Sequence, residues 1–295
     1  MKNDLPHLLI PLSLLLVGLA TTSVVGAQGS VTVHEEKEPI IQSFDTRLIT
    51  GLMYYNYSDT TFEDQFSDNI PFYGFGASYG ISSPIGNISV DAYIQRTDKG
   101  KDGFFEEHLD DIYRPPVNTD ARFNRDDYAI TMNYQFGSIY GWQIPLFVGY
   151  KWGETTLERT EISLSTDFYP LAQVKTNFNT EGPVVGAGIT FPIAKNKKHR
   201  AGIYGAYGIL TGEHKQTIRG GGDIVVEAIP YTDTTYTWKV GINFNGELVK
   251  LPIGKLNYTI SLDSYSYTMD LFMYETDSPL EEEIHSVNAS VNWAF

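Results

Sequence analysis

The chain has 295 residues, a formal net charge of −15 at pH 7, no cysteine and 14% aromatic residues. The acidic balance argues against nucleic acid as a partner, because phosphate backbones are bound by basic surfaces. The lack of cysteine excludes a disulfide framework and thiol chemistry. After residue 27 no apolar run reaches the length of about 18 residues that a transmembrane helix requires.

The N-terminal residues 1–27 have the features of a secretory signal peptide. Lys2 supplies a charged start, an apolar run follows, and Val25-Gly26-Ala27 is a small-residue cleavage signal. The sequence therefore predicts cleavage near Ala27, a polar periplasmic lead-in over residues 28–45, and one domain over residues 46–295. A retained helical anchor is the alternative to cleavage.

From residue 46 onward, apolar and polar residues alternate with a period of two, which is typical of strands with one apolar and one polar face. In the first strand, from Arg47 to Tyr57, the parity is ambiguous. Counts of eight or twelve strands are the alternatives to the count of about ten that we favour. With boundaries good to about two to four residues, we expect strands at 46–58, 71–82, 87–97, 125–137, 141–154, 179–192, 199–212, 233–246, 254–267 and 283–295.

The last strand has the clearest pattern. One face carries Val287, Ala289, Val291, Trp293 and Phe295, and the other carries Ser286, Asn288, Ser290 and Asn292. A terminal Phe with an aromatic residue two positions before it resembles the C-terminal strand of Gram-negative outer membrane β-barrels. In that family the terminal Phe is the assembly signal. The resemblance therefore implies the barrel-assembly machinery as a partner that recognises Phe295.

Short and long connections alternate along the chain. The short ones are 83–86, 137–141, 194–198 and 247–253, and the long ones are 59–70, 98–124, 155–178, 213–232 and 268–282. Several long connections keep the alternation, which predicts hairpins that rise above the membrane. Short periplasmic turns and long outer hairpins are typical of an all-β, antiparallel up-and-down transmembrane β-barrel. We therefore expect a barrel in the outer membrane, in contact with its lipid and lipopolysaccharide. A soluble periplasmic β-sandwich is the alternative.

The inward face of this barrel is expected to be small and neutral, with a few ionisable side chains. These lumen candidates are Asp91, Asp127, Lys151, Lys239 and Asp263. In one interpretation they pair across a filled interior, because about ten strands is near the size at which side chains fill a barrel. In the other, water fills the lumen and these charges select small polar solutes.

The ten-strand count resembles the omptin outer-membrane proteases in architecture. In that family, paired aspartates in the second outer loop and an Asp-x-His in the fourth loop activate water. The second loop here contains Glu106, Glu107, Asp110 and Asp111, and the fourth begins Gly212-Glu213-His214. Gly212 stands where the family has Asp, so the resemblance is topological and carries no catalytic residue to this chain.

The remaining motifs have structural explanations. Gly76-Ala77-Ser78-Tyr79-Gly80 matches the nucleophile elbow of hydrolases, but it lies inside a predicted strand, where the strained turn of that motif cannot form. No histidines and acids have metal-ligand spacing, so we predict neither a metal nor another cofactor. The basic turn at Lys195, Lys197, Lys198 and Arg200 suits solvent or anionic lipid headgroups.

These observations favour a small porin-like channel for small polar solutes, or an uncharacterised surface barrel, over an enzyme. Two alternatives stay open at this point. One is an omptin-like surface hydrolase, and the other is a non-catalytic adhesin or binding barrel.

Overall fold

The computed structural model describes residues 41–59, 64–83, 86–97, 100–107, 121–136, 141–161, 172–193, 198–219, 225–227, 230–270 and 279–295. The predicted signal peptide and residues 28–40 of the predicted lead-in lie outside these residues. None of the described residues forms a helix that could cross a membrane. The strands are β1 (Ile41–Asp59), β2 (Asp64–Ser83), β3 (Gly86–Thr97), β4 (Gly100–Glu107), β5 (Ala121–Phe136), β6 (Pro145–Glu161), β7 (Ala172–Pro192), β8 (His199–Arg219), β9 (Val225–Glu227), β10 (Tyr231–Leu251), β11 (Gly254–Asp270) and β12 (Pro279–Ala294).

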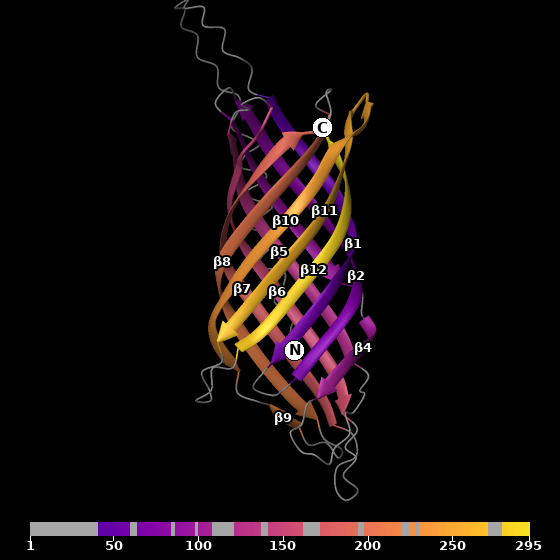
Figure 1. Ribbon diagram of the computed structural model, residues 1–295, viewed down its shortest axis with the longest axis vertical. Helices are drawn as coiled ribbons and strands as arrows, with labels where there is room; N and C mark the ends of the chain where they lie inside the picture. Colours follow the sequence, from indigo (N-terminus) through magenta and orange to yellow (C-terminus); the bar gives the residue numbers. More distant parts are fainter. Residues whose placement is uncertain are drawn as a thin grey trace, which may run out of the picture. The chain divides into compact units, whose positions relative to one another are not determined.

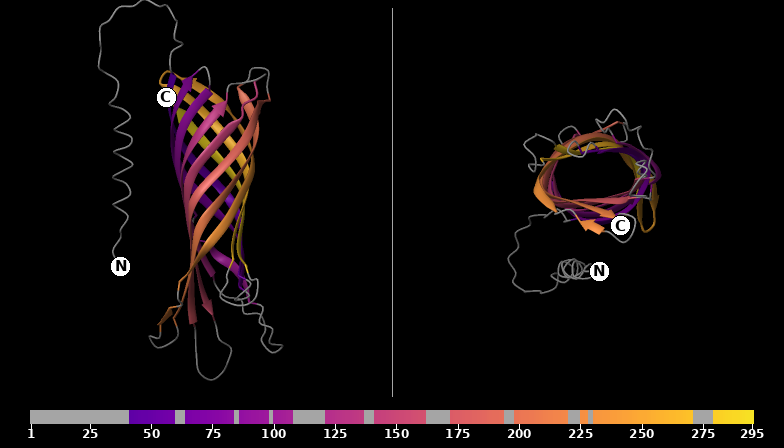
Figure 2. Two further views of the ribbon diagram at one scale, coloured as in Figure 1. Left: turned by 90° about the vertical axis from the view of Figure 1, so that its left-hand side faces the viewer. Right: turned by 90° about the horizontal axis from the view of Figure 1, so that it is seen from below.

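The strands form one closed antiparallel barrel, seen from the side in Figure 1 and along its axis in Figure 2. Closure comes from β1, which pairs with β2 on one side and with β12 on the other, from Asp45 opposite Ala294 to Asp59 opposite Leu280. The short β4 continues β3 between β2 and β5, and the short β9 precedes β10 beside β8. The wall therefore has ten strand positions, which we call staves, because β3 with β4 and β9 with β10 each count as one. This confirms the predicted fold class and strand count.

The two ends of the barrel differ as predicted. We call the end with the short connections the turn end, and the opposite end the loop end. Strands continue further toward the loop end than the sequence indicated, because β6 runs to Glu161 and β7 begins at Ala172. The first long connection, predicted as 59–70, shrinks to 60–63 because β2 already begins at Asp64. The expected hairpins are thus continuous extensions of the barrel wall.

Two boundaries at the turn end also differ from the prediction. β1 begins at Ile41 rather than at residue 46. The predicted turn over 247–253 is wrong, because β10 continues to Leu251 with an irregularity between Glu247 and Val249. Only Pro252 and Ile253 form the turn, and Gly254 follows with a φ of 139° that side chains with a Cβ rarely adopt.

An apolar belt surrounds the outside of the barrel nearest the turn end. Its rows are those predicted from the alternation, and residues such as Leu48 and Val287 are 68% and 54% exposed. Aromatic side chains border the belt on both sides. The border toward the loop end includes Tyr54, Tyr73, Trp152, Tyr207, Tyr236 and Trp238, and the border toward the turn end includes Phe44, Phe136, Trp142, Phe244 and Phe295. On β1 the two borders are ten positions apart, from Phe44 to Tyr54, which corresponds to the apolar band of about 25 Å on membrane barrels.

The apolar face changes sides along the strands. In β1, Leu48 and Leu52 point outward, but further toward the loop end Met53, Tyr55 and Tyr57 are buried inside with exposures of 1%, 0% and 3%. The strand therefore has a polar interior in its first half and an apolar interior in its second half. This switch explains why the parity of the first strand was ambiguous in the sequence.

Candidate functional site

All five lumen candidates project into the interior, where each is close to an opposite charge. Nearest the turn end, Asp91 accepts hydrogen bonds from both Nη atoms of Arg47, each at 2.6 Å. Further toward the loop end, Lys239 Nζ lies 3.5 Å from Asp263, and Lys151 Nζ lies 3.2 Å from Asp127. The candidates thus form pairs with one another or with a residue that the sequence analysis did not select.

Contacts of Arg125 and Lys151 cross the lumen to β12 and β11. Arg125 of β5 donates from Nε to Asp127 at 2.9 Å and from Nη1 to Glu282 of β12 at 2.6 Å. Glu282 also accepts a hydrogen bond of 2.5 Å from the hydroxyl of Tyr55 on β1. Lys151 of β6 donates to the hydroxyl of Tyr267 on β11. Arg125 and Glu282 are 2% and 0% exposed, so these charges are shielded from water.

Tyrosine rings fill the space around the buried cations. The guanidinium of Arg125 lies 4.8 Å from the ring centre of Tyr267, and Lys239 Nζ lies 4.4 Å from that of Tyr265. Lys239 also donates to the hydroxyl of Tyr265 at 2.7 Å, and Tyr204 donates to Asp263. We call this set the charge layer: Arg125, Lys151, Lys239, Asp127, Asp263, Glu282, Tyr55, Tyr204, Tyr265 and Tyr267. Its three cations balance its three carboxylates.

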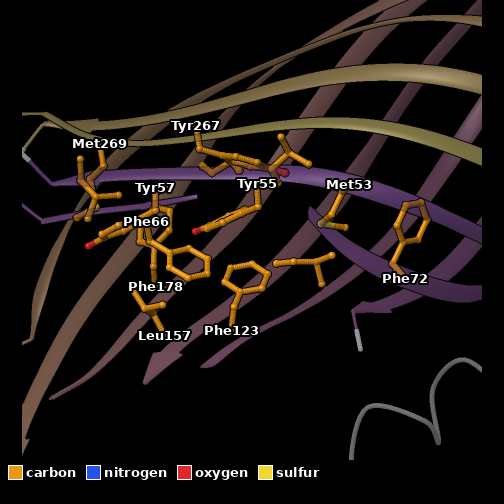
Figure 3. Packing of buried hydrophobic residues seen from close by; sticks show 14 residues of the cluster. Met53, Tyr55, Tyr57, Phe66, Phe72, Phe123, Leu157, Phe178, Tyr267 and Met269 are labelled. Carbon is orange, nitrogen blue, oxygen red and sulfur yellow. The ribbon is translucent and has the colours of Figure 1, made fainter. Parts of the chain in front are cut away.

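An apolar cluster, whose residues Figure 3 shows, packs around the charge layer and shares Tyr55 and Tyr267 with it. The rings of Tyr55 and Phe123, from β1 and β5, have centres 4.0 Å apart, and Phe66 of β2 stacks on Phe123 at 5.7 Å. The cluster draws on eight of the staves, and every member is at most 4% exposed. Its members are Met53, Tyr55, Tyr57, Phe66, Ile70, Phe72, Phe123, Leu157, Phe178, Leu210, Tyr267, Met269, Leu280 and Ile284.

Together the two layers occlude the described part of the lumen. Contacts in the charge layer cross the interior, and the inward side chains of the apolar cluster are at most 4% exposed, so no solute can pass unless this packing breaks. The charge layer is stable only as a complete set, because a buried ion left without its partner costs about 3–5 kcal/mol. This arrangement suits a rigid, closed barrel.

The sequence analysis missed several residues of these layers. Arg125 shares its parity with Asp127 two positions later, so the alternation contained the signal that both point inward. Glu282 falls at the end of the long connection predicted over 268–282, but it lies in β12 and pairs with Arg125. Arg47 and Tyr55 lie in the strand whose parity was ambiguous. Only the folded barrel brings β5 and β12 across from each other.

Of the residues considered under the omptin resemblance, Gly212, Glu213 and His214 lie in β8 toward the loop end. His214 points into the barrel on β8 with an exposure of 6%, and its Nε2 is 3.4 Å from the hydroxyl of Tyr57. Gly212, two positions earlier, also points inward and supplies no carboxylate. The side chains of Glu106, Glu107, Asp110 and Asp111 lie outside the described residues. The described residues contain no group of three or more His, Cys, Asp and Glu that could hold a metal.

Solved structures with the same overall chain path are known. The outer membrane protease OmpT from Escherichia coli matches with a TM-score of 0.57 at 11% identity, over 88% of this chain and 99% of that one. At this identity the similarity shows a shared barrel fold and nothing about activity. No family model matches the sequence, and no curated protein matches it.

Two further similarities are weaker. The translocator domain of the autotransporter NalP from Neisseria meningitidis matches at 11% identity with a TM-score of 0.43, over 98% of this chain and 96% of that one. The toluene transporter TodX from Pseudomonas putida matches at 9% identity with a TM-score of 0.40, over 86% of this chain and 89% of that one. We draw no functional argument from either.

Proposed function

We propose that this protein is an outer-membrane β-barrel of a Gram-negative bacterium that works at its loop end as a closed, rigid binding platform. The observation that supports this most is the occluded lumen, in which the apolar cluster and the charge layer join opposite walls. A solute path would have to break contacts that bury both charges and aromatic rings. We therefore favour the binding barrel over the porin-like channel.

The membrane location is supported by the outer surface. The apolar belt with its two aromatic borders has the dimensions and composition of a lipid-facing band. Beyond it, outward residues are polar, and Arg96 and Asp126 form a bidentate ion pair of 2.7 and 2.5 Å on the outside. About half of each long strand therefore projects past the belt, and we infer that this half carries the loop end away from the membrane. Recognition of Phe295 by the assembly machinery and cleavage near Ala27 belong to the same proposal.

A charge placed on the belt tests the lipid contact. Leu48→Arg is expected to destabilise the barrel by about 2–4 kcal/mol, because a cation near the bilayer midplane loses its hydration. Asn56→Arg, on the same strand and the same outward face but beyond the belt, is expected to change stability by less than about 0.5 kcal/mol. Urea titrations of both variants refolded into lipid vesicles measure the difference. Equal effects of the two variants would contradict the assignment of the belt.

Conductance of the unaltered protein tests the closed lumen. Purified barrel reconstituted in planar bilayers is expected to give no single-channel steps. Folding is checked in the same preparation by heat-modifiable migration on gels. Regular conductance steps from the folded protein would overturn the binding platform in favour of the porin-like channel.

The hydrolase alternative has less support. It would rest on His214, whose environment contains the hydroxyl of Tyr57 and an inward glycine at position 212 instead of an aspartate. General base catalysis by histidine needs a group that orients the ring as well as a bound water. Cleavage of a basic peptide by the purified protein, lost in His214→Ala, would be the result that favours this alternative.

A further inference from the structure

The carboxylates of the lumen differ in their partners. Asp91, Asp127, Asp263 and Glu282 each lie within 3.5 Å of a cation. Asp45 also points inward, near the turn end, but among the described residues no Lys, Arg or His forms an ion pair with it. Among the described residues, the only side chain that donates a hydrogen bond to Asp45 is Ser78, from Oγ at a long 3.4 Å. Asp45 is thus a partly buried carboxylate that forms no ion pair with a described residue.

The nearest cation to Asp45 on this strand, Arg47, is bound to another carboxylate. Arg47 follows Asp45 by two positions on the same inward face of β1, but both of its Nη atoms bind Asp91 at 2.6 Å. A bidentate guanidinium–carboxylate pair has a fixed geometry, so Arg47 cannot turn to Asp45 without giving up that pair. Arg47 is near enough to attract the negative charge of Asp45, but Asp45 has no hydrogen-bonded ion pair of its own while the Arg47–Asp91 pair is formed.

A pocket of about 190 Å³ opens beside this carboxylate. It is lined by Asp45, Thr46, Arg47, Ser78, Asn257 and Asn292, which come from four adjacent staves at the turn end. The register places Ser78 opposite Asp45 and Asn257 opposite Asn292. The side chain of Asn257 forms no hydrogen bond with any described residue, so its amide oxygen is available to a ligand. A carboxylate, an amide and a hydroxyl thus line one small cavity.

We propose that this pocket binds the primary ammonium group of a small polar solute that enters from the turn end. The carboxylate of Asp45 supplies the charge, and the oxygens of Ser78 and Asn257 accept the remaining N–H bonds. An ammonium fits this set because it is a compact cation with three donors. Calcium suits it less well, since it takes six to eight oxygen ligands, usually several carboxylates among them. This site is at the opposite end of the lumen from the proposed binding platform, and does not depend on it.

Saturation-transfer NMR on the full chain in detergent tests the proposal. The probe is ethylammonium, whose methyl signal is observable, and tetramethylammonium is the control that has the same charge but no N–H donor. We expect saturation of ethylammonium and little of tetramethylammonium, and at least a tenfold weaker response in Asp45→Asn. Asp233→Asn, an inward acid near the loop end, is the matched control and is expected to bind as the unaltered protein does.

Three results would overturn the proposal. They are an unchanged response in Asp45→Asn, equal binding of both ammonium ions, and no response of the unaltered protein. Displacement of ethylammonium by millimolar calcium but not by equal ionic strength of sodium chloride would instead identify a metal site and would also reject an ammonium site. Heat-modifiable migration of each variant shows whether the barrel is folded in every sample.

Discussion

Replacing Tyr55 and Phe123 by alanine is expected to turn a silent barrel into a conducting one. Their rings are 4.0 Å apart and come from β1 and β5, two strands that are not neighbours in the wall, so the pair fills interior space within the apolar cluster. Tyr55 also holds Glu282 through its hydroxyl at 2.5 Å, so its removal loosens the charge layer as well. Planar bilayer recordings of the double variant are expected to show discrete conductance steps where the unaltered protein shows none.

A matched pair of outward aromatics serves as the control for this experiment. Tyr73 and Phe75 of β2 are 56% and 47% exposed on the belt, and their replacement by alanine removes similar ring volume without touching the lumen. This control is expected to stay silent. Each core truncation typically costs about 3–5 kcal/mol, so the fold of the double variant is checked first. A folded but silent double variant would show that the aromatic contact is not the barrier.

Arg125→Met is expected to be the most destabilising single change in the charge layer. It leaves Glu282 without its cation in a site that is 0% exposed, and it removes one of the two cations of Asp127. Breaking a buried pair in this way costs about 3–5 kcal/mol, because the remaining charge has neither water nor a partner. Urea-induced unfolding from lipid vesicles, followed by tryptophan fluorescence, measures the loss.

The double variant Arg125→Met with Glu282→Leu distinguishes charge from packing. It removes both ions, and Asp127 keeps Lys151 at 3.2 Å, so most of the lost stability is expected to return. Lys175→Met is the surface control, since Lys175 and Glu158 form an exposed pair at 3.2 Å with side chains 47% and 48% exposed. Exposed pairs contribute about 0–1 kcal/mol. A double variant as unstable as Arg125→Met would contradict the view that the unpaired charge causes the loss.

The sequence predicted the outside of this barrel well. Rows such as Val287, Val291 and the aromatic residues around them alternate without interruption, because a lipid-facing surface requires an apolar residue at every second position. The same parity assigned Asp91, Asp127, Lys151, Lys239 and Asp263 to the interior. It also placed Ser78 inside a strand and not on a catalytic turn, as β2 shows.

The loop-end half was harder to predict from the sequence. There the apolar residues move to the inside, so Met53 and Tyr55 break the parity that Leu48 and Leu52 set up. In the sequence, such a segment does not show which of its residues face outward, and it resembles the start of a loop. This is why strand ends beyond the belt, including Glu282, were assigned to connections.

The amino-acid sequence alone determined that the chain forms about ten alternating strands with an apolar exterior, because that pattern is local and repeats every two residues. The tertiary structure decided which inward residues meet. Arg125 and Glu282 are 157 positions apart, and only closure of the wall and its register bring them to 2.6 Å. Whether the interior is open or closed depends on such contacts between opposite staves, and no local pattern contains them.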